Sequence, residues 1–128
     1  MTGKKVLVVD DEIHIVHVVA IKLRNNGYEV FTAENGSEGF KIACQEKPDA
    51  IITDFQMPSM TGLEMLEALR KNADTASVPV IMLTARGFAI EDSQKQSLNI
   101  WDCLSKPFSP KELLRTVEDA LHEALVTQ

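Results

Sequence analysis

The sequence has little of what marks several large classes of protein. Its two cysteines, Cys44 and Cys103, stand far apart and in no metal-ligand spacing, so no disulfide framework is expected and a reducing cytoplasm fits best. No apolar run approaches the roughly 18 residues of a membrane span. The apolar stretch near the N-terminus, residues 6–9, is too short for a signal peptide. We therefore expect a cytoplasmic protein that makes no contact with a membrane.

Basic residues and phosphate-binding loops are also scarce. Lysine and arginine number 13 against 19 acidic residues, and the net charge of -6 argues against direct binding of nucleic acid. Neither G-x-G-x-x-G nor G-x-x-x-x-G-K-[ST] occurs, which excludes the common nucleotide-binding loops. The 128 residues, 45% of them hydrophobic, suffice for one domain, 1–128, with a substantial core.

Short apolar runs alternate with segments of helical spacing along the chain. The runs that predict strands are 4–9, 28–32, 50–53, 80–83 and 101–104. The segments that predict helices are 13–24, 35–46, 63–70, 90–98 and 109–126. Asn35 with Glu38, and Ser109 with Glu112, have the spacing of helix-capping pairs. The alternation predicts an α/β fold, a doubly wound parallel sheet of five strands flanked by five helices.

Polar residues follow four of the five predicted strands. Asp10 and Asp11 follow the first strand, Asp54 the third, Thr84 the fourth and Lys106 the fifth. A sheet of order 2-1-3-4-5 binds ligands outside the carboxyl ends of its strands, between the first and third. Because neighbouring strands lie about 4.8 Å apart, these side chains are expected to meet at one edge.

The residue types at this edge predict phosphoryl chemistry. Gathered carboxylates repel one another unless a cation joins them, and Mg²⁺ prefers such hard oxygen ligands. A phosphoryl group brings about -1.5 to -2 charges, which the metal and Lys106 would balance while the Thr84 hydroxyl donates to one of its oxygens. A carboxylate can serve as the nucleophile and form an aspartyl-phosphate, and Asp54 is the most central candidate. Each feature taken alone also fits a helix cap or a turn.

Four motifs in order resemble the receiver domain of bacterial two-component response regulators. They are VLVVDDE at 6–12, DFQMPSMTG at 54–62, VIMLTA at 80–85 and LSKPF at 104–108. The resemblance covers nearly the whole chain and includes single-domain receivers of the chemotaxis type. It implies the flavodoxin-like sheet of order 2-1-3-4-5.

The resemblance also implies what the site does. A sensor histidine kinase or a phosphotransfer protein would donate a phosphoryl group to Asp54, in a reaction that needs Mg²⁺. Asp11 would bind the metal directly and Asp10 through water, with Asp54 and the backbone carbonyl of Gln56 as further ligands. Such a domain catalyses only its own phosphorylation and dephosphorylation, and is a regulatory domain rather than an enzyme.

Thr84 and Lys106 would bind the phosphoryl oxygens, and slow hydrolysis would reset the switch. The resemblance implies that the Lys106–Pro107 peptide bond is cis and directs the lysine into the pocket. A downstream protein would then bind through the fourth helix, the fifth strand and the fifth helix.

Two positions depart from the usual pattern of the family. Cys103 occupies the place, three residues before the lysine, of an aromatic residue that normally moves with the threonine. Trp101, two residues earlier, is expected either to pack at the strand start or to anchor a partner on the exposed face. Gln56 and Arg86 stand two residues after Asp54 and Thr84, where side chains flank the path of the hydrolytic water, so we expect Arg86 to change the lifetime of the phosphorylated form.

Two other functions compete with this prediction. The domain would be a phosphorylation-independent scaffold if the pocket were vestigial, and Cys103 is the feature that favours this. An independent hydrolase with an aspartyl nucleophile usually has Asp-x-Asp after the first strand, whereas this chain has Asp10-Asp11-Glu12. Both a stand-alone receiver and a domain of a larger chain fit the sequence.

Overall fold

Five parallel strands form one central sheet in the order β2-β1-β3-β4-β5, as predicted. The computed structural model describes residues 3–57, 60–85 and 92–126. The elements are β1 (Lys5–Val9), α1 (Ile13–Arg24), β2 (Glu29–Ala33), α2 (Gly36–Glu46), β3 (Ala50–Asp54), α3 (Gly62–Lys71), β4 (Val80–Thr84), α4 (Asp92–Ser97), β5 (Ile100–Ser105) and α5 (Pro110–Val126). Each predicted strand is therefore confirmed within one residue at either end.

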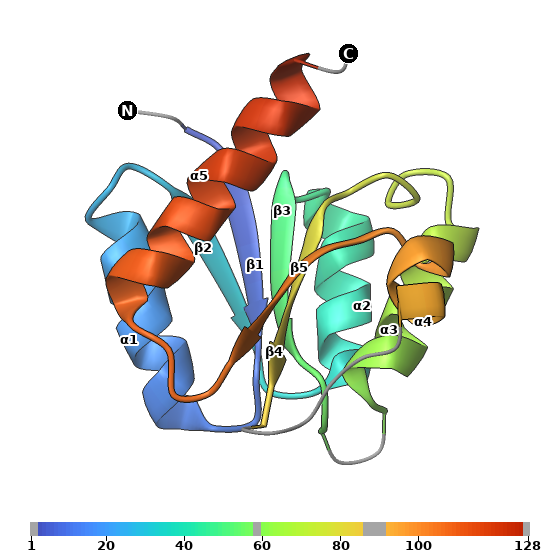
Figure 1. The fold of residues 1–128 in the computed structure, drawn as a ribbon, viewed down its shortest axis with the longest axis horizontal. Helices are drawn as coiled ribbons and strands as arrows, with labels where there is room; N and C mark the ends of the chain where they lie inside the picture. Colours follow the sequence, from blue (N-terminus) through green and yellow to red (C-terminus); the bar gives the residue numbers. More distant parts are fainter. Residues whose placement is uncertain (1–2, 58–59, 86–91, 127–128) are drawn as a thin grey trace.

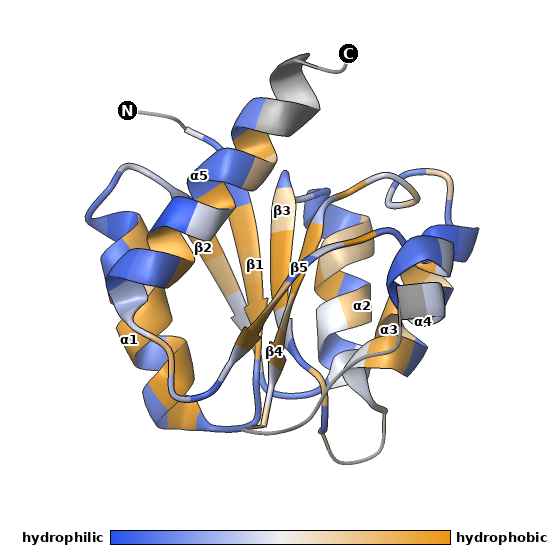
Figure 2. Cartoon of the chain, viewed as in Figure 1, coloured by the Kyte–Doolittle hydropathy of each residue, from blue (hydrophilic) through white to orange (hydrophobic). Residues whose placement is uncertain are grey.

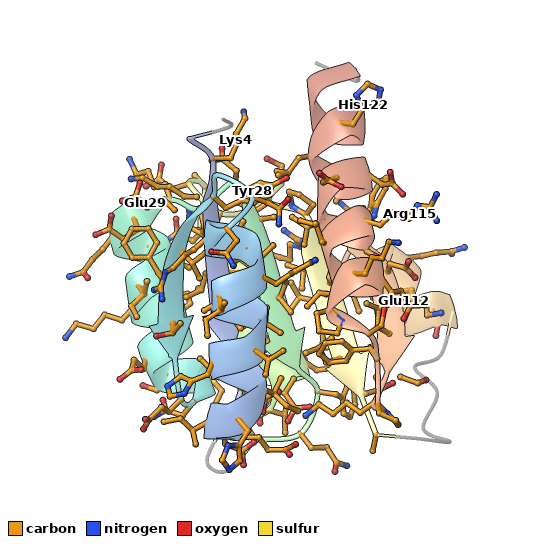
Figure 3. All side chains as sticks on the ribbon, turned by 90° about the vertical axis from the view of Figure 1, so that its left-hand side faces the viewer. Lys4, Tyr28, Glu29, Glu112, Arg115 and His122 are labelled. Carbon is orange, nitrogen blue, oxygen red and sulfur yellow. The ribbon has the colours of Figure 1, made fainter. Side chains whose placement is uncertain are left out.

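The helices cover the sheet on both faces. Figure 1 shows α1 and α5 on one side of the strands and α2, α3 and α4 on the other. In the view of Figure 3, α1 and α5 lie side by side in front of the sheet. All strands run in the same direction, so their carboxyl ends and the loops that follow lie together at the lower edge in Figure 1.

The apolar core is split into two clusters by the sheet. In β1, Val6 and Val8 face the cluster under α1 and α5, whereas Leu7 and Val9 face the cluster under α2 and α3. All four are fully buried, which explains why this strand is an uninterrupted apolar run. Figure 2 shows the same division, with apolar strands between helices whose outer faces are largely hydrophilic.

Two helices begin close to the residues whose side chains predict a cap. The Asn35 side chain accepts a hydrogen bond of 2.8 Å from the Glu38 backbone, and the Ser109 hydroxyl accepts one of 2.9 Å from the Glu112 backbone. The Glu38 carboxylate reaches the backbone N–H of Glu34 rather than that of Asn35, so the first pair is not a closed capping box.

Strand β5 contains a bulge that its sequence does not predict. Val80 pairs with Ile100 and the next β4 residue, Ile81, pairs with Asp102, so Trp101 has no partner on β4. Such a bulge locally twists a strand and turns a side chain away from the ladder. Trp101 is 40% exposed. The preceding helix α4 is shorter than the predicted 90–98, whose first two residues lie outside the described ranges.

A half-buried arginine holds the start of β5 against α3. The Arg70 guanidinium donates to the backbone carbonyls of Leu98 at 2.7 Å, Asn99 at 3.1 Å, Ala76 at 3.0 Å and Thr75 at 3.2 Å. Burial lowers the pKa of Arg70 from its usual value, because desolvation disfavours the charged guanidinium. The turn before β5 is thereby tied to the C-terminal end of α3.

Among the helices that the structure describes, none has the length and apolar character needed to cross a bilayer.

Candidate functional site at the carboxyl edge of the sheet

The residues predicted to form the site lie at the carboxyl edge of the sheet. Asp10 follows β1, Asp54 ends β3, Thr84 ends β4 and Lys106 follows β5. Asp10 is fully buried, and Asp54 and Thr84 are nearly so. Asp11, by contrast, is exposed. Burying polar side chains costs free energy, because they lose hydration on folding. Their presence at the ends of three adjacent strands of a largely apolar sheet therefore indicates a functional site.

Lys106 connects three carboxylates. Its ammonium nitrogen Nζ lies 2.8 Å from Glu12 Oε1, 3.0 Å from Asp10 Oδ2 and 3.4 Å from Asp54 Oδ1. The lysine side chain is only 17% exposed, so its stem is packed and its charged end lies within the pocket. The Lys106–Pro107 bond is cis, as the resemblance implies. The backbone N–H of Lys106 donates to the Thr84 carbonyl at 2.8 Å, which joins the ends of β4 and β5.

Burial sets the protonation behaviour of the pocket. Burial, and then the charge of Asp10, raise the pKa of Asp54 from 3.8 to about 6, although Lys106 opposes this change. Burial also raises the pKa of Asp10, against the hydrogen bond from Glu12 and the contact with Lys106. Burial alone would lower the pKa of Lys106, but hydrogen bonds and charges from the carboxylates outweigh it and raise that pKa.

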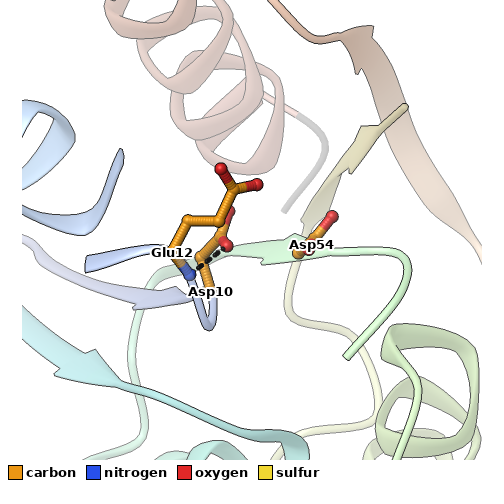
Figure 4. A group of neighbouring side chains, drawn as sticks. All are labelled: Asp10, Glu12 and Asp54. Atoms are coloured by element: carbon orange, nitrogen blue, oxygen red, sulfur yellow. Dashed lines mark hydrogen bonds between the residues drawn. The ribbon is translucent and has the colours of Figure 1, made fainter. Parts of the chain in front are cut away.

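Oxygen atoms of Asp10, Glu12 and Asp54 lie within 4.8 Å of one another, close enough to share one cation (Figure 4). Asp10 Oδ1 accepts a hydrogen bond of 2.9 Å from the Glu12 backbone. Its other oxygen, Oδ2, is buried and has no hydrogen-bond donor in good geometry within the described residues, although it forms the ion pair with Lys106. Hard oxygen donors with a free lone pair fit a cation such as Mg²⁺. The predicted ligand Asp11 lies outside this group.

Thr84 lies beside the pocket and is bonded to β5. Its hydroxyl donates to the Leu104 carbonyl at a long distance of 3.5 Å. Thr84 pairs with Ser105 in the register of β4 and β5, one residue before Lys106. A weak bond of this length is easily exchanged for another acceptor.

The start of α3 is packed against the backbone of Asp54. Thr61 and Glu64 form a closed capping box, with bonds of 3.1 Å and 2.9 Å, and the Gly62 N–H donates to the Phe55 carbonyl at 2.8 Å. A Cβ at Gly62 would overlap the carbonyl oxygen of Asp54. Glycine is therefore required here by close approach of two backbones.

Two further predicted residues, Cys103 and Gln56, form none of the ion pairs described above. Cys103 is half-buried and packs against the cluster under α2 and α3. Burial raises the pKa of its thiol. Gln56, two residues after Asp54, is exposed. Arg86 lies outside the described residues.

Two residues with structural consequences for the site were missed by sequence reasoning. Glu12 makes the shortest contact with Lys106, and Gly62 allows α3 to approach Asp54. Glu12 is the last of three consecutive acidic residues and directly precedes the first helix. This position is the feature of the sequence that could have identified it. Gly62 stands at the end of the DFQMPSMTG motif, but its role depends on packing.

The fold and the acidic, lysine-bridged edge define a regulatory α/β domain of the phospho-accepting class. Residues 6–118 match the family model described as response regulator receiver domain. The chain belongs to this family, whose members accept a phosphoryl group in two-component signal transduction. The family and fold predicted from the sequence are thereby confirmed.

Individual relatives agree with this membership. The chain is 38% identical over 123 residues to the phosphate regulon transcriptional regulatory protein PhoB of Pseudomonas aeruginosa, covering 94% of this chain but 53% of PhoB. It is 32% identical to protein PilH of the same species, covering 91% of this chain and 97% of PilH. The structure of chemotaxis response regulator CheY4 of Vibrio cholerae superposes with a TM-score of 0.85 at 37% identity, covering 93% of this chain and 99% of CheY4. The chain thus spans about half the length of PhoB and of several other transcriptional regulators that it matches, but nearly all of PilH and CheY4.

Proposed function

We propose that Asp54 accepts a phosphoryl group from the phosphohistidine of a sensor histidine kinase or a phosphotransfer protein. The observation that carries the proposal is the position of its carboxylate, buried at the end of β3 and 3.4 Å from the Lys106 ammonium. With a pKa of about 6, Asp54 is mostly ionised at neutral pH and can act as a nucleophile. The setting is the cytoplasm, which suits the two free thiols.

In the transfer step, an oxygen of Asp54 attacks phosphorus. The P–O bond to Asp54 forms as the P–N bond to the donor histidine breaks, and the histidine nitrogen keeps the electron pair and takes up a proton from solvent. Hydrolysis reverses the state: water attacks phosphorus, the P–O bond to Asp54 breaks, and inorganic phosphate leaves. Lys106 moves no proton in either step and binds a phosphoryl oxygen through its N–H donors.

Asp10 and Asp54 are the buried residues that would hold Mg²⁺, with Asp11 and the backbone carbonyl of Gln56 completing the set. Asp10 Oδ2 supports this assignment, because it is buried and accepts no hydrogen bond among the described residues, although it forms an ion pair with Lys106. When bound, the ion neutralises negative charge on the phosphoryl oxygens.

Thr84 is the residue that responds to phosphorylation of Asp54. Its hydroxyl leaves the weak bond to the Leu104 carbonyl and donates to a phosphoryl oxygen, which pulls the end of β4 toward Asp54. Cys103 is smaller than an aromatic residue and half-buried, so the change reaches the surface through the backbone of β5 rather than through a ring. A downstream protein binds the face of α4, β5 and α5, where Trp101 is exposed.

The test is incubation of the protein with acetyl phosphate and Mg²⁺, followed by intact mass spectrometry. One phosphoryl adduct is expected, absent from Asp54→Asn and present in Asp119→Asn, which removes the same charge from an exposed position on α5. Omission of Mg²⁺ should abolish the adduct. A folded native protein that gains no adduct would instead support a phosphorylation-independent scaffold.

A further inference from the structure

The side chain of Glu12 has a role that helix capping does not explain. Glu12 is the N-cap residue of α1, and its carbonyl accepts from the N–H groups of Ile15 and Val16. Its side chain makes no capping bond. Asp, Asn, Ser and Thr are the residues that cap this position well, because their short side chains reach back to the helix. The longer glutamate side chain points to Lys106 instead.

The contact with Lys106 is the shortest that the ammonium makes. Glu12 Oε1 lies 2.8 Å from Nζ, and the two residues are 94 positions apart in the chain. The Glu12 side chain is 58% exposed, whereas that of Asp10 is fully buried. Glu12 therefore approaches the ammonium from the solvent side, which is the side from which a phosphoryl group must arrive.

We propose that Glu12 is a positioning residue that holds the Lys106 ammonium away from the incoming phosphoryl group and so slows phosphorylation of Asp54. The proposal rests on the function proposed above. An ammonium has three N–H donors. The ion pairs with Asp10 and Asp54 can remain during transfer, but the donor that is hydrogen-bonded to Glu12 has to be released before it can bind a phosphoryl oxygen.

Removal of Glu12 leaves Lys106 in place. Asp10 at 3.0 Å and Asp54 at 3.4 Å still bind the ammonium, and the lysine stem is packed. Glu12→Gln should therefore raise the rate of adduct formation from acetyl phosphate by about two- to five-fold, the size expected of an ion pair with one exposed partner. The increase should shrink at high ionic strength, because salt screens that pair.

The Glu12→Asp variant distinguishes the effect of side-chain length from the effect of negative charge. Aspartate keeps the negative charge and is a better N-cap, but its side chain is one methylene shorter and does not reach Nζ. We expect Glu12→Asp to be phosphorylated as fast as Glu12→Gln, and the ammonium protons of Lys106 to exchange faster with water in both variants, as measured by NMR. A Glu12→Asp rate equal to that of the native protein would overturn the proposal, because charge alone would then explain the effect.

Two other results would also overturn it. A native-like rate in Glu12→Gln, with the native protein phosphorylated, would reject the role of Glu12 and leave the proposed function intact. A loss of Mg²⁺ affinity of about ten-fold or more in Glu12→Gln would make Glu12 a metal ligand instead. Absence of any adduct in the native protein, with its fold intact, would reject the proposed function. The Lys106 proton exchange would then still test whether Glu12 holds the ammonium, because it does not depend on phosphorylation, and exchange equal to the native rate in both variants would overturn that contact.

Discussion

Replacement of Asp54 by asparagine is expected to stabilise the metal-free protein at neutral pH. Asp54 is 7% exposed, and its pKa rises from 3.8 to about 6 because burial and the charge of Asp10 disfavour the ionised carboxylate. One pKa unit corresponds to about 1.4 kcal/mol, so ionised Asp54 costs the folded state about 3 kcal/mol. Asparagine has the shape of the carboxyl group without its charge, and removes this cost.

The pH dependence identifies the cause. Between about pH 4 and pH 6 the folded protein binds a proton at Asp54 that the unfolded chain has lost, so native stability falls as pH rises through this window. The gain in Asp54→Asn should be about 3 kcal/mol at about pH 8, corresponding to roughly 10 °C in Tm, and should vanish near pH 4. Thermal and urea unfolding in the presence of a chelator measure both quantities.

The control is Asp119→Asn, which makes the same change in net charge at an exposed site of α5 and should alter stability by less than about 0.5 kcal/mol. Saturating Mg²⁺ should narrow the difference between native and Asp54→Asn, because a bound cation favours the ionised carboxylate. A variant no more stable than the native protein at about pH 8 would refute the reasoning. So would a stability gain that persists unchanged near pH 4, since the charge of Asp54 is absent there.

Three further changes test other parts of the structure. Gly62→Ala should lower stability by about 1–3 kcal/mol and slow phosphorylation of Asp54, because the added Cβ pushes on the Asp54 carbonyl. A variant with the urea unfolding and the adduct rate of the native protein would show that α3 can move aside. Trp101→Ala should weaken binding of the downstream partner by over about 1 kcal/mol in calorimetric titration while phosphorylation is unchanged, and equal affinity would discard the anchor. Arg70→Met should cost about 2 kcal/mol and speed amide exchange at Leu98, because several backbone carbonyls lose their donor; unchanged exchange would mean that water replaces the guanidinium.

Lys106 and Thr84 have different bonding partners in the unphosphorylated protein and in the proposed phosphorylated state. Without a phosphoryl group, the lysine is bound by carboxylates and the Thr84 hydroxyl by a carbonyl of β5. A phosphoryl group on Asp54 offers stronger, charged acceptors to both. The energy that drives the proposed switch is therefore the difference between these two sets of bonds at one edge of the sheet.

Local sequence patterns were enough to predict the sheet and the strand ends. Runs such as 50–53 are apolar on both faces, as a covered parallel strand requires, and the polar residues that follow four of the five runs mark the edge where the chain leaves the core. Asp54, Thr84 and Lys106 follow from this placement, and their meeting at one edge was predictable because parallel strands all end on the same side.

What only the tertiary structure decided depends on contacts between distant parts of the chain. The bond between Glu12 and Lys106 joins residues 94 positions apart, and the need for glycine at Gly62 arises from the backbone of Asp54. The bulge that leaves Trp101 unpaired is a property of two strands together. The sequence by itself determined which polar residues lie at the carboxyl edge of the sheet, because that depends on local periodicity. The structure decided which carboxylate holds the lysine, because that depends on distances that no local pattern encodes.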